Sequence, residues 1–353
     1  MNRQEQPTSP LARPASGTDS LNSLSLVGDD DDDESVMGRR TTQPAPRLAI
    51  GALIEGRLRI LRILGRGGMS EVYEAQDERA GRTVAVKLMT SEECLDAKLA
   101  IFAEARSLLG FHHPNVVGFY GVGAVESQPF IELESVKGGS LSALVDVDGA
   151  IPAREALEIL IPVADAIGAL HGAGIVHRDV KGDNVLLTEE GRPVIADFGL
   201  AMHAENLPML PRGIVGTPAY MAPEAILGIT ETFEQYAFAD QYSFAVLAYY
   251  ALTGTMPFHA ATPSGLFYAQ MAVEPESLVS RCASVPDSLD AIVIRALSKR
   301  PNDRFPTMAA MRDAMAAVRD TLPETTGVRR ISRESGVLVA KPSLQPTVVA
   351  DPG

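Results

Sequence analysis

The residues of this 353-residue chain with the clearest capacity for chemistry lie in the run His177-Arg178-Asp179-Val180-Lys181-Gly182-Asp183-Asn184. Asp179, Lys181 and Asn184 place a carboxylate, an ammonium and a carboxamide within six positions. These groups can accept a hydroxyl proton, neutralise a phosphate and hold a divalent metal. Thirteen residues after Asn184 comes the run Asp197-Phe198-Gly199, whose aspartate adds an oxygen ligand that suits Mg²⁺. The set is suited to phosphoryl transfer, which needs alignment and charge neutralisation more than covalent help.

A glycine-rich turn and a lysine lie upstream, in a stretch that alternates like strands. The turn begins at Gly65-Arg66-Gly67-Gly68, and Lys87 ends the apolar run Val84-Ala85-Val86. Glycines let the backbone approach phosphate oxygens, and a lysine at the end of a buried strand can hold its ammonium in a cleft. Taken singly, the turn is equally a plain β-turn and Lys87 a surface lysine. A dinucleotide-binding fold fits less well, because its glycines open a helix, whereas a strand follows here at Val72.

Read in order, these four elements resemble the signature set of protein kinases. The run from His177 to Asn184 closely resembles that of bacterial Hanks-type, eukaryotic-like Ser/Thr protein kinases. The resemblance covers roughly residues 56 to 320 and implies transfer of the ATP γ-phosphate, with Mg²⁺, to Ser or Thr hydroxyls of proteins. It implies that Asp179 is the base and that Lys181 stabilises charge on the transferring group. Lysine at position 181 is the form seen in Ser/Thr kinases, so tyrosine specificity is not expected.

The resemblance also assigns the metal and nucleotide sites. Asn184 and Asp197 would hold Mg²⁺, while Lys87 would contact the α and β phosphates. Glu104, on a helix expected from about residue 95 to 109, would hold Lys87 in place. The other residues expected at the nucleotide come from the glycine turn, the strands and the hinge: Leu64, Gly65, Arg66, Gly67, Gly68, Met69, Ser70, Glu71, Val72, Ala85, Leu133 (the gatekeeper), Glu134, Val136 and Leu186.

Two of these positions depart from the usual pattern. Ser70 replaces the third glycine of the turn, and its hydroxyl or backbone N–H can serve instead. Glu132 lies in a strand at a position that is usually apolar. It is expected either to face solvent or to pair with a neighbouring base.

The stretch beyond Asp197 resembles the peptide platform of Ser/Thr kinases at Gly216-Thr217-Pro218-Ala219-Tyr220-Met221-Ala222-Pro223-Glu224. By that resemblance Thr217 would bridge Asp179 and Lys181. Glu224 would pair with Arg304, and Asp240 would anchor the catalytic run. His177 is expected to be a packed, structural histidine.

The stretch from Phe198 through Gly216 contains no Ser, Thr or Tyr. Arg178 would ordinarily receive a phosphate from this activation loop in kinases of its type. We therefore hypothesise that loop phosphorylation does not switch the enzyme on, and that Glu205 supplies a permanent negative charge for Arg178.

The surrounding pattern predicts an α+β fold. Alternating segments at 58–63, 72–75 and 83–86, with further strand-like segments around 116–119 and 130–133, precede a mostly helical region. Apolar spacing near 3.6 predicts helices at 153–171 and 287–297, and the apolar stretch 244–252 is too short to span a bilayer. A β-rich front and an α-rich back predict two lobes with a cleft between them. The resemblance implies a two-lobed protein kinase fold, with a β-rich N-lobe carrying helix αC at 53–137 and a mostly helical C-lobe at 138–321.

Two tails flank this region. Residues 1–52 form an acidic, Ser/Pro-rich tail predicted to be disordered, and 322–353 a flexible C-terminal tail. Arginine pairs precede Thr42 and Ser332, which are candidate autophosphorylation sites; the alternative is ordinary linker charge.

Composition restricts the partners. A net charge of −14 argues against general binding to nucleic acid or anionic membranes, and no signal peptide or membrane insertion is expected. Two remote cysteines, Cys94 and Cys282, favour a reducing cytoplasm. Two rival functions remain: a nucleotide-binding pseudokinase scaffold, and a small-molecule kinase of similar fold. Retention of the catalytic and metal residues disfavours the first, and the platform at 216–224 disfavours the second.

Overall fold

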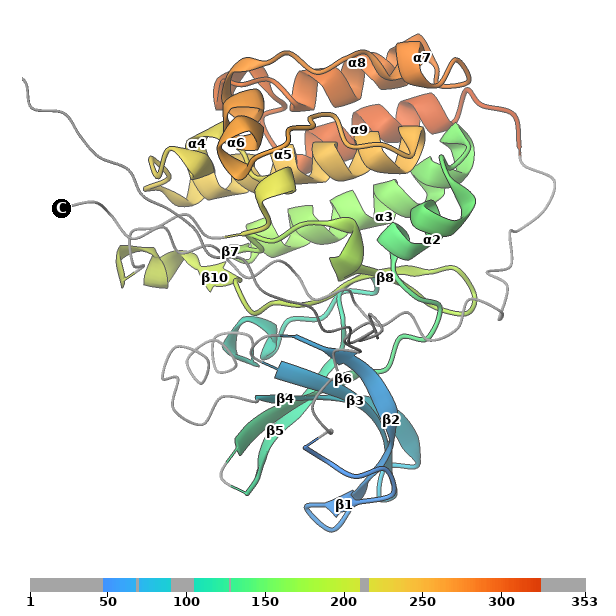
Figure 1. The fold of residues 1–353 in the computed structure, drawn as a ribbon, viewed down its shortest axis with the longest axis vertical. Coiled ribbons are helices and arrows are strands. Elements are labelled where there is room, and N and C mark those ends of the chain that lie inside the picture. Colours follow the sequence, from blue (N-terminus) through green and yellow to red (C-terminus); the bar gives the residue numbers. More distant parts are fainter. Residues whose placement is uncertain (1–46, 68–69, 90–104, 127, 210–215, 325–353) are drawn as a thin grey trace, which may run out of the picture. The chain divides into compact units, whose positions relative to one another are not determined.

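The computed structural model describes residues 47–67, 70–89, 105–126, 128–209 and 216–324 (Figure 1). Within these ranges a curled sheet and a set of packed helices occupy two separate regions (Figure 1). We call them the small lobe, residues 47–137, and the large lobe, residues 138–324. The predicted two-lobed α+β architecture is confirmed, whereas the predicted domain boundaries stay a prediction.

The small lobe is built on a six-stranded sheet in the order β1-β2-β3-β4-β6-β5, with antiparallel neighbours. The strands are β1 (Leu53–Ile54), β2 (Leu58–Arg66), β3 (Ser70–Asp77), β4 (Arg82–Met89), β5 (Phe119–Val125) and β6 (Gln128–Glu134). Because side chains alternate between faces, one face carries Tyr73, Val84 and Val86 into a core of its own. Leu48 packs into that core, ahead of the predicted start of the lobe at residue 53.

The opposite face of the sheet presents the residues expected at the nucleotide. Val72 lies directly across from Lys87, and Ala85 lies across from Leu133. Opposite residues of an antiparallel pair point to the same face, so the strand register alone aligns these four side chains.

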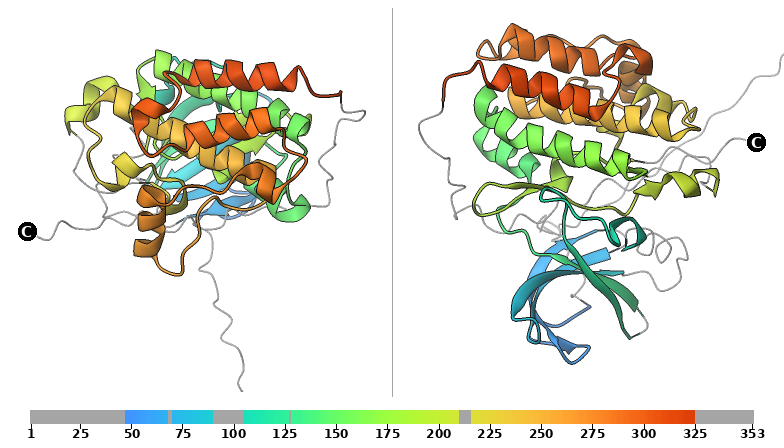
Figure 2. Two further views of the ribbon diagram at one scale, coloured as in Figure 1. Left: turned by 90° about the horizontal axis from the view of Figure 1, so that it is seen from above. Right: turned by 180° about the vertical axis from the view of Figure 1, so that it is seen from behind.

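The large lobe is mostly helical. Its α-helices are α2 (Leu141–Asp148), α3 (Ala153–Gly172), α4 (Pro223–Ile226), α5 (Phe233–Thr253), α6 (Pro263–Ala272), α7 (Leu278–Arg281), α8 (Asp287–Ala296) and α9 (Met308–Arg319). Short 3₁₀ helices are η1 (Gly182–Asn184), η2 (Ala204–Met209), η3 (Pro218–Tyr220) and η4 (Pro301–Asp303). Helix α3 packs against both α5 and α9, as the two further views show (Figure 2). The helices predicted at 153–171 and 287–297 are confirmed, and 244–252 lies within the buried α5.

Four short strands bring the catalytic run to the edge of the large lobe that faces the sheet. They are β7 (Ile175–Val176), β8 (Val185–Leu187), β9 (Pro193–Ile195) and β10 (Met202–His203), paired as β7–β10 and β8–β9. The run from His177 to Asn184 therefore lies between β7 and β8, and Asp197 follows β9.

One predicted strand begins later than its sequence pattern indicates. Strand β5 starts at Phe119, whereas Val116 and Val117 are buried outside it. Val117 N donates to the carbonyl of Ile195 at 2.9 Å, so this apolar pair packs on the large lobe instead of extending the sheet.

Some predicted features lie outside the described residues. Of the helix expected at 95–109, the described part is helical over 105–108. Tail residues 1–46 and 325–353, which include Thr42 and Ser332, also lie outside, as does Cys94. Among the described helices, none is long and apolar enough to cross a membrane.

Candidate active site

The glycine turn joins β2 to β3. Gly67 N donates to Ser70 O at 2.8 Å, and Gly65 lies across from Val72. Gly68 and Met69 lie outside the described residues. The apolar residues expected at the nucleotide all belong to or pack against one cluster that continues into the large lobe: Leu64, Val72, Ala85, Leu133, Val136 and Leu186.

Charged residues beside the turn point to the other face of the sheet. Arg66 Nε lies 3.5 Å from Glu71 Oε1, and Glu71 also accepts a hydrogen bond from the Tyr73 hydroxyl. Because Glu71 alternates with Val72 along β3, its side chain is turned away from the nucleotide face. The backbone of Arg66 and Glu71 remains beside the turn, whereas their side chains are engaged elsewhere.

The hinge is held from behind by an ion pair. Glu134 Oε1 lies 2.6 Å from Arg192 Nη2, and Glu134 Oε2 accepts from Gly118 N at 3.2 Å. After the hinge, Gly138 N donates to Leu187 O at 2.7 Å. A Cβ on Gly138 would lie 2.6 Å from the Leu187 and Thr188 carbonyl oxygens, so glycine is required for β8 to approach. Leu186 of β8 then forms an isolated antiparallel bridge with Ser140.

The lobes meet at an ion pair between two of the motifs. Lys87 Nζ lies 2.7 Å from Asp197 Oδ1, and their side chains are 14% and 49% exposed. The positive charge of Lys87 lowers the pKa of Asp197 to about 2. Asp197 has a left-handed backbone with φ of 61°, a strained conformation that the surrounding structure must hold. Glu104, the expected partner of Lys87, lies outside the described residues.

The catalytic run forms a closed set of polar contacts. Lys181 Nζ lies 2.7 Å from Asp179 Oδ2, and it donates to Thr217 Oγ1 at 2.9 Å. Thr217 Oγ1 in turn donates to Asp179 Oδ1 at 2.7 Å. The predicted bridge by Thr217 is thus confirmed. It joins the start of the 216–224 platform to the carboxylate expected to meet the acceptor hydroxyl.

Asn184 is oriented by the same carboxylate. Its Nδ2 donates to Asp179 O at 2.8 Å and to Asp179 Oδ2 at 3.1 Å. The Asn184 backbone carbonyl accepts from Ala196 N at 2.8 Å, which brings the chain around Asn184 close to Asp197. With the amide nitrogen engaged, the Asn184 side-chain oxygen is left as the atom that can face a cation.

These donors fit Mg²⁺. Among the described residues there is no group of three or more His, Cys, Asp or Glu side chains that could hold a metal. Mg²⁺ keeps several waters and uses one or two carboxylates together with substrate phosphates, so it does not require a cage made wholly of protein. One carboxylate at Asp197 and one amide oxygen at Asn184 match that requirement.

Asp240 on α5 anchors the run, as predicted. It accepts hydrogen bonds from His177 N and Arg178 N, each at 2.8 Å, and its side chain is 1% exposed. Burial raises the pKa of Asp240, but the hydrogen bond and charge of His171 more than offset this and hold the pKa below its usual value. His171, which lies in α3, was not predicted, because a single histidine within a helix belongs to no motif.

His177 is packed, as predicted. Its ring lies 4.8 Å from the Phe198 ring, and its Nε2 donates to Ala196 O at 3.2 Å. Its Nδ1 accepts from Asp179 N at 3.3 Å. His177 therefore ties the catalytic run to the chain around Asp197.

The platform that follows Thr217 is fixed from two helices. The Gln270 amide on α6 donates to Ala219 O at 2.7 Å, and the Ser243 hydroxyl on α5 donates to Tyr220 O at 2.8 Å. The predicted pair of Glu224 with Arg304 is confirmed as a buried, bidentate contact with N–O distances of 2.6 and 2.9 Å. Gln270 and Ser243 were not anticipated, because single polar residues in a helix carry no motif.

Two expectations about charged residues are resolved. Glu132 pairs with Arg57, which also lies 3.0 Å from Asp77, so of the two alternatives pairing holds. Glu205, by contrast, was expected beside Arg178 but its nearest described cation is Arg106, at 3.9 Å. The Glu205 side chain is 83% exposed, and among the described residues its ion pair is with Arg106 and not with Arg178.

A two-lobed fold with an ion pair joining the lobes and a polar loop beneath it defines a protein kinase domain. Residues 58–315 match the protein kinase domain family. The chain therefore belongs to this family, and the predicted kinship with bacterial Hanks-type Ser/Thr kinases is confirmed by its relatives.

Three relatives illustrate the kinship. The serine/threonine-protein kinase PknB of Mycolicibacterium smegmatis is 34% identical over 80% of this chain and 46% of its own length. The serine/threonine-protein kinase PksC of Streptomyces coelicolor is 35% identical over 76% of this chain and 50% of its own length. The serine/threonine-protein kinase Pkn1 of Myxococcus xanthus is 35% identical over 74% of this chain and 38% of its own length. The chain thus spans half or less of the length of these relatives.

Proposed function

We propose that this protein is a serine/threonine protein kinase that transfers the γ-phosphate of ATP to Ser or Thr hydroxyls of protein substrates. The observation that carries the proposal is the 2.7 Å pair of Lys87 with Asp197, which joins a strand of the small lobe to a loop of the large lobe. A nucleotide bound between the lobes would meet a cation for its phosphates and a carboxylate for their metal at one place.

Each residue of the catalytic run has a role that its contacts support. Asp179 would accept the proton of the acceptor hydroxyl and orient the hydroxyl oxygen. The hydrogen bonds that both its carboxylate oxygens accept would hold the carboxylate in one orientation for this role. Lys181, 2.7 Å from that carboxylate, would neutralise charge on the transferring phosphoryl group. Thr217 would link Asp179 to Lys181 through its hydroxyl and fix the start of the substrate platform.

Asn184 and Asp197 are the residues that would hold Mg²⁺, which supplies charge neutralisation at the phosphates when bound. The apolar residues of β2, β3, β4, β6 and β8 would enclose the adenine: Leu64, Val72, Ala85, Leu133, Val136 and Leu186. The backbone of Glu134 to Val136 would face the edge of the adenine ring. Ser70 and the glycines of the turn would approach the phosphates, and Glu104 would hold Lys87.

The fixed platform supports a protein substrate over a small molecule. Gln270 and Ser243 hold the carbonyls of Ala219 and Tyr220 immediately beyond Thr217, which itself contacts Asp179. An extended peptide laid along this segment would bring its hydroxyl to the base. The net charge of −14 disfavours nucleic acid as partner, and we infer a reducing cytoplasm from the two remote cysteines.

The test uses the purified chain with labelled ATP, Mg²⁺ and casein, followed by phosphoamino-acid analysis. Wild type is expected to yield phosphoserine and phosphothreonine. Asp179→Asn is expected to lower the rate at least about a hundredfold, since a positioned base contributes on the order of 10²–10⁴. Asp313→Asn, the same change at a 67% exposed site on α9, is the control and should leave the rate unchanged. Nucleotide binding without transfer by wild type would instead identify a pseudokinase, and phosphotyrosine would contradict the assigned specificity.

A further inference from the structure

Arg178 occupies an unusual position next to the proposed base. Its backbone is left-handed, with φ of 66°, and its amide donates to Asp240 Oδ1 at 2.8 Å. A non-glycine residue in this conformation is strained and persists only where the surrounding structure holds it. The orientation of the peptide between Arg178 and Asp179 therefore depends on the contacts that hold the backbone and the side chain of Arg178.

The side chain of Arg178 is fixed by an aromatic ring. Its guanidinium carbon lies 5.3 Å from the centroid of Tyr236, and burial lowers the pKa of Arg178 without discharging it. Among the described residues, no carboxylate lies within 4.0 Å of its guanidinium nitrogens to form an ion pair. The positive charge is thus met by the face of a ring, which attracts cations through its quadrupole, and by the negative charge of Asp240 nearby.

Tyr236 and Asp240 lie on the same face of α5, because they are four residues apart in one helix. Asp240 holds the backbone of Arg178, and Tyr236 lies beneath its guanidinium. The helix start is itself fixed by a capping box between Thr232 and Gln235. One turn of α5 therefore contacts Arg178 at two places, its backbone amide and its guanidinium.

We propose that Tyr236 is a positioning residue for phosphotransfer, which holds Arg178 and thereby Asp179 in the working arrangement without a phosphate on the stretch 198–216. That stretch contains no Ser, Thr or Tyr, so it offers no hydroxyl for such a phosphate. Glu205, which lies within it, is directed to Arg106 instead of Arg178. The inference rests on the proposed kinase activity and specifies how that activity is maintained.

The ring and a phosphate differ in a way that can be measured. A phosphate would be removed by a phosphatase, whereas the contact with Tyr236 is permanent. Wild-type protein treated with phosphatase, and shown by mass spectrometry to be unmodified, is therefore expected to keep its kcat. Loss of most activity on this treatment would overturn the proposal, and this measurement does not depend on any variant.

Variants of Tyr236 then distinguish the effect of its aromatic face from the effects of its hydroxyl and of its side-chain volume. Tyr236→Leu and Tyr236→Met remove the aromatic face and are expected to lower kcat about tenfold, with KM for ATP and for a short peptide within about twofold. Tyr236→Phe keeps the face and is expected to restore kcat to within about twofold of wild type. Tyr120→Leu is the matched control, since Arg82 lies over the Tyr120 ring at 3.6 Å on the small lobe, and its kcat should not change.

Folding is followed in parallel by the melting temperature and by titration of ATP-competent sites. A purely structural role would lower the number of competent sites and leave kcat per site unchanged, and that result would overturn the proposal. So would a kcat within twofold of wild type in both the Leu and Met variants, or a Phe variant as impaired as they are. A different result would indicate that the kinase assignment itself fails. In that case the wild type would be inactive when unmodified and would still not phosphorylate casein after incubation with ATP.

Discussion

The two halves of the site are held by different means. In the large lobe, polar side chains are fixed by other buried polar side chains: Asp240 by His171, and Glu224 by Arg304. In the small lobe, strand register aligns Val72, Ala85, Lys87 and Leu133 on one face, and no side-chain network is needed for that alignment. The difference teaches that the half proposed to perform the chemistry is specified residue by residue, whereas the half proposed to enclose the nucleotide is specified mainly by the strand register.

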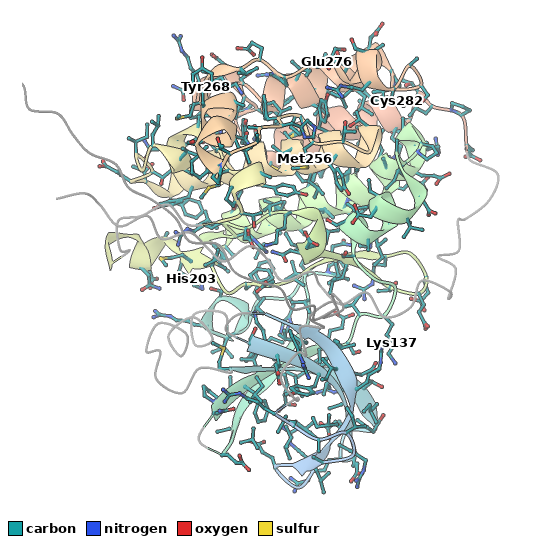
Figure 3. The ribbon with its side chains drawn as sticks, viewed as in Figure 1. Lys137, His203, Met256, Tyr268, Glu276 and Cys282 are labelled. Atoms are coloured by element: carbon teal, nitrogen blue, oxygen red, sulfur yellow. The ribbon has the colours of Figure 1, made fainter. Side chains whose placement is uncertain are left out.

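The small lobe also has ion networks. Arg57 pairs with Glu132 and Asp77 on the sheet, and a second network lies near the hinge. Glu74 on β3 lies 2.6 Å from Arg62 Nε and 3.3 Å from Lys137 Nζ, and it accepts from the Ser135 hydroxyl at 3.2 Å. Figure 3 labels Lys137 among the side chains of the small lobe. Burial raises the pKa of Glu74, but the hydrogen bond and charge of Arg62, with Lys137, bring it below its usual value. Its basic partners are about 40% exposed, unlike the fully buried Arg304.

The largest expected effect is at the buried pair of the large lobe. Arg304→Met should destabilise the protein by about 3–5 kcal/mol, because it leaves the Glu224 carboxylate buried without its bidentate partner. Chemical denaturation measures this loss. The double variant Glu224→Leu with Arg304→Met removes both charges and should lose less than the single change. A single-variant loss below about 1 kcal/mol would contradict the claim that buried charge fixes this lobe.

A smaller loss is expected at the hinge network. Glu74→Gln keeps the shape of the side chain but removes the charge shared by Arg62 and Lys137, and should destabilise by about 1 kcal/mol. Added salt should shrink the difference between variant and wild type, since both bases are partly exposed. A loss as large as that of Arg304→Met would erase the contrast between the lobes.

A third prediction concerns the pH dependence of stability at a half-buried lysine of the large lobe. Burial lowers the pKa of Lys299 to about 8, although its ammonium donates to Gln270 O at 2.9 Å and lies 4.0 Å from the Phe258 ring. Between pH 8 and about 10.5 the unfolded chain binds more protons at Lys299 than the folded chain. The free energy of unfolding therefore rises with pH over this range. The melting temperature of wild type relative to Lys299→Met should therefore increase over this range. A difference independent of pH would contradict the shift.

The contacts among the proposed catalytic residues could be predicted, because phosphoryl transfer demands particular side chains at short, fixed spacings. Asp179, Lys181 and Asn184 fall within one run, and their mutual contacts follow from it. The same holds for the sheet, whose alternation identifies β2, β3 and β4.

Partners far apart in the chain were not predictable. Glu132 pairs with Arg57 75 residues away, and Gln270 reaches Ala219 51 residues away. Periodicity indicates that such a residue is buried but not what it meets. The late start of β5 has the same cause, since the apolar pair Val116 and Val117 signals burial without revealing that its partner, Ile195, lies in the other lobe.

The central claim is that Lys87 and Asp197, drawn from two lobes, serve one magnesium-bound nucleotide. The most direct measurement is the rise in melting temperature on adding MgATP, which reports binding to the folded state. Wild type and Asp179→Asn should both show the rise, whereas Lys87→Met and Asp197→Asn should each lose most of it. Combining the last two changes should lose little more, because both residues act on the same ligand. A wild-type rise in either Lys87→Met or Asp197→Asn would contradict the account.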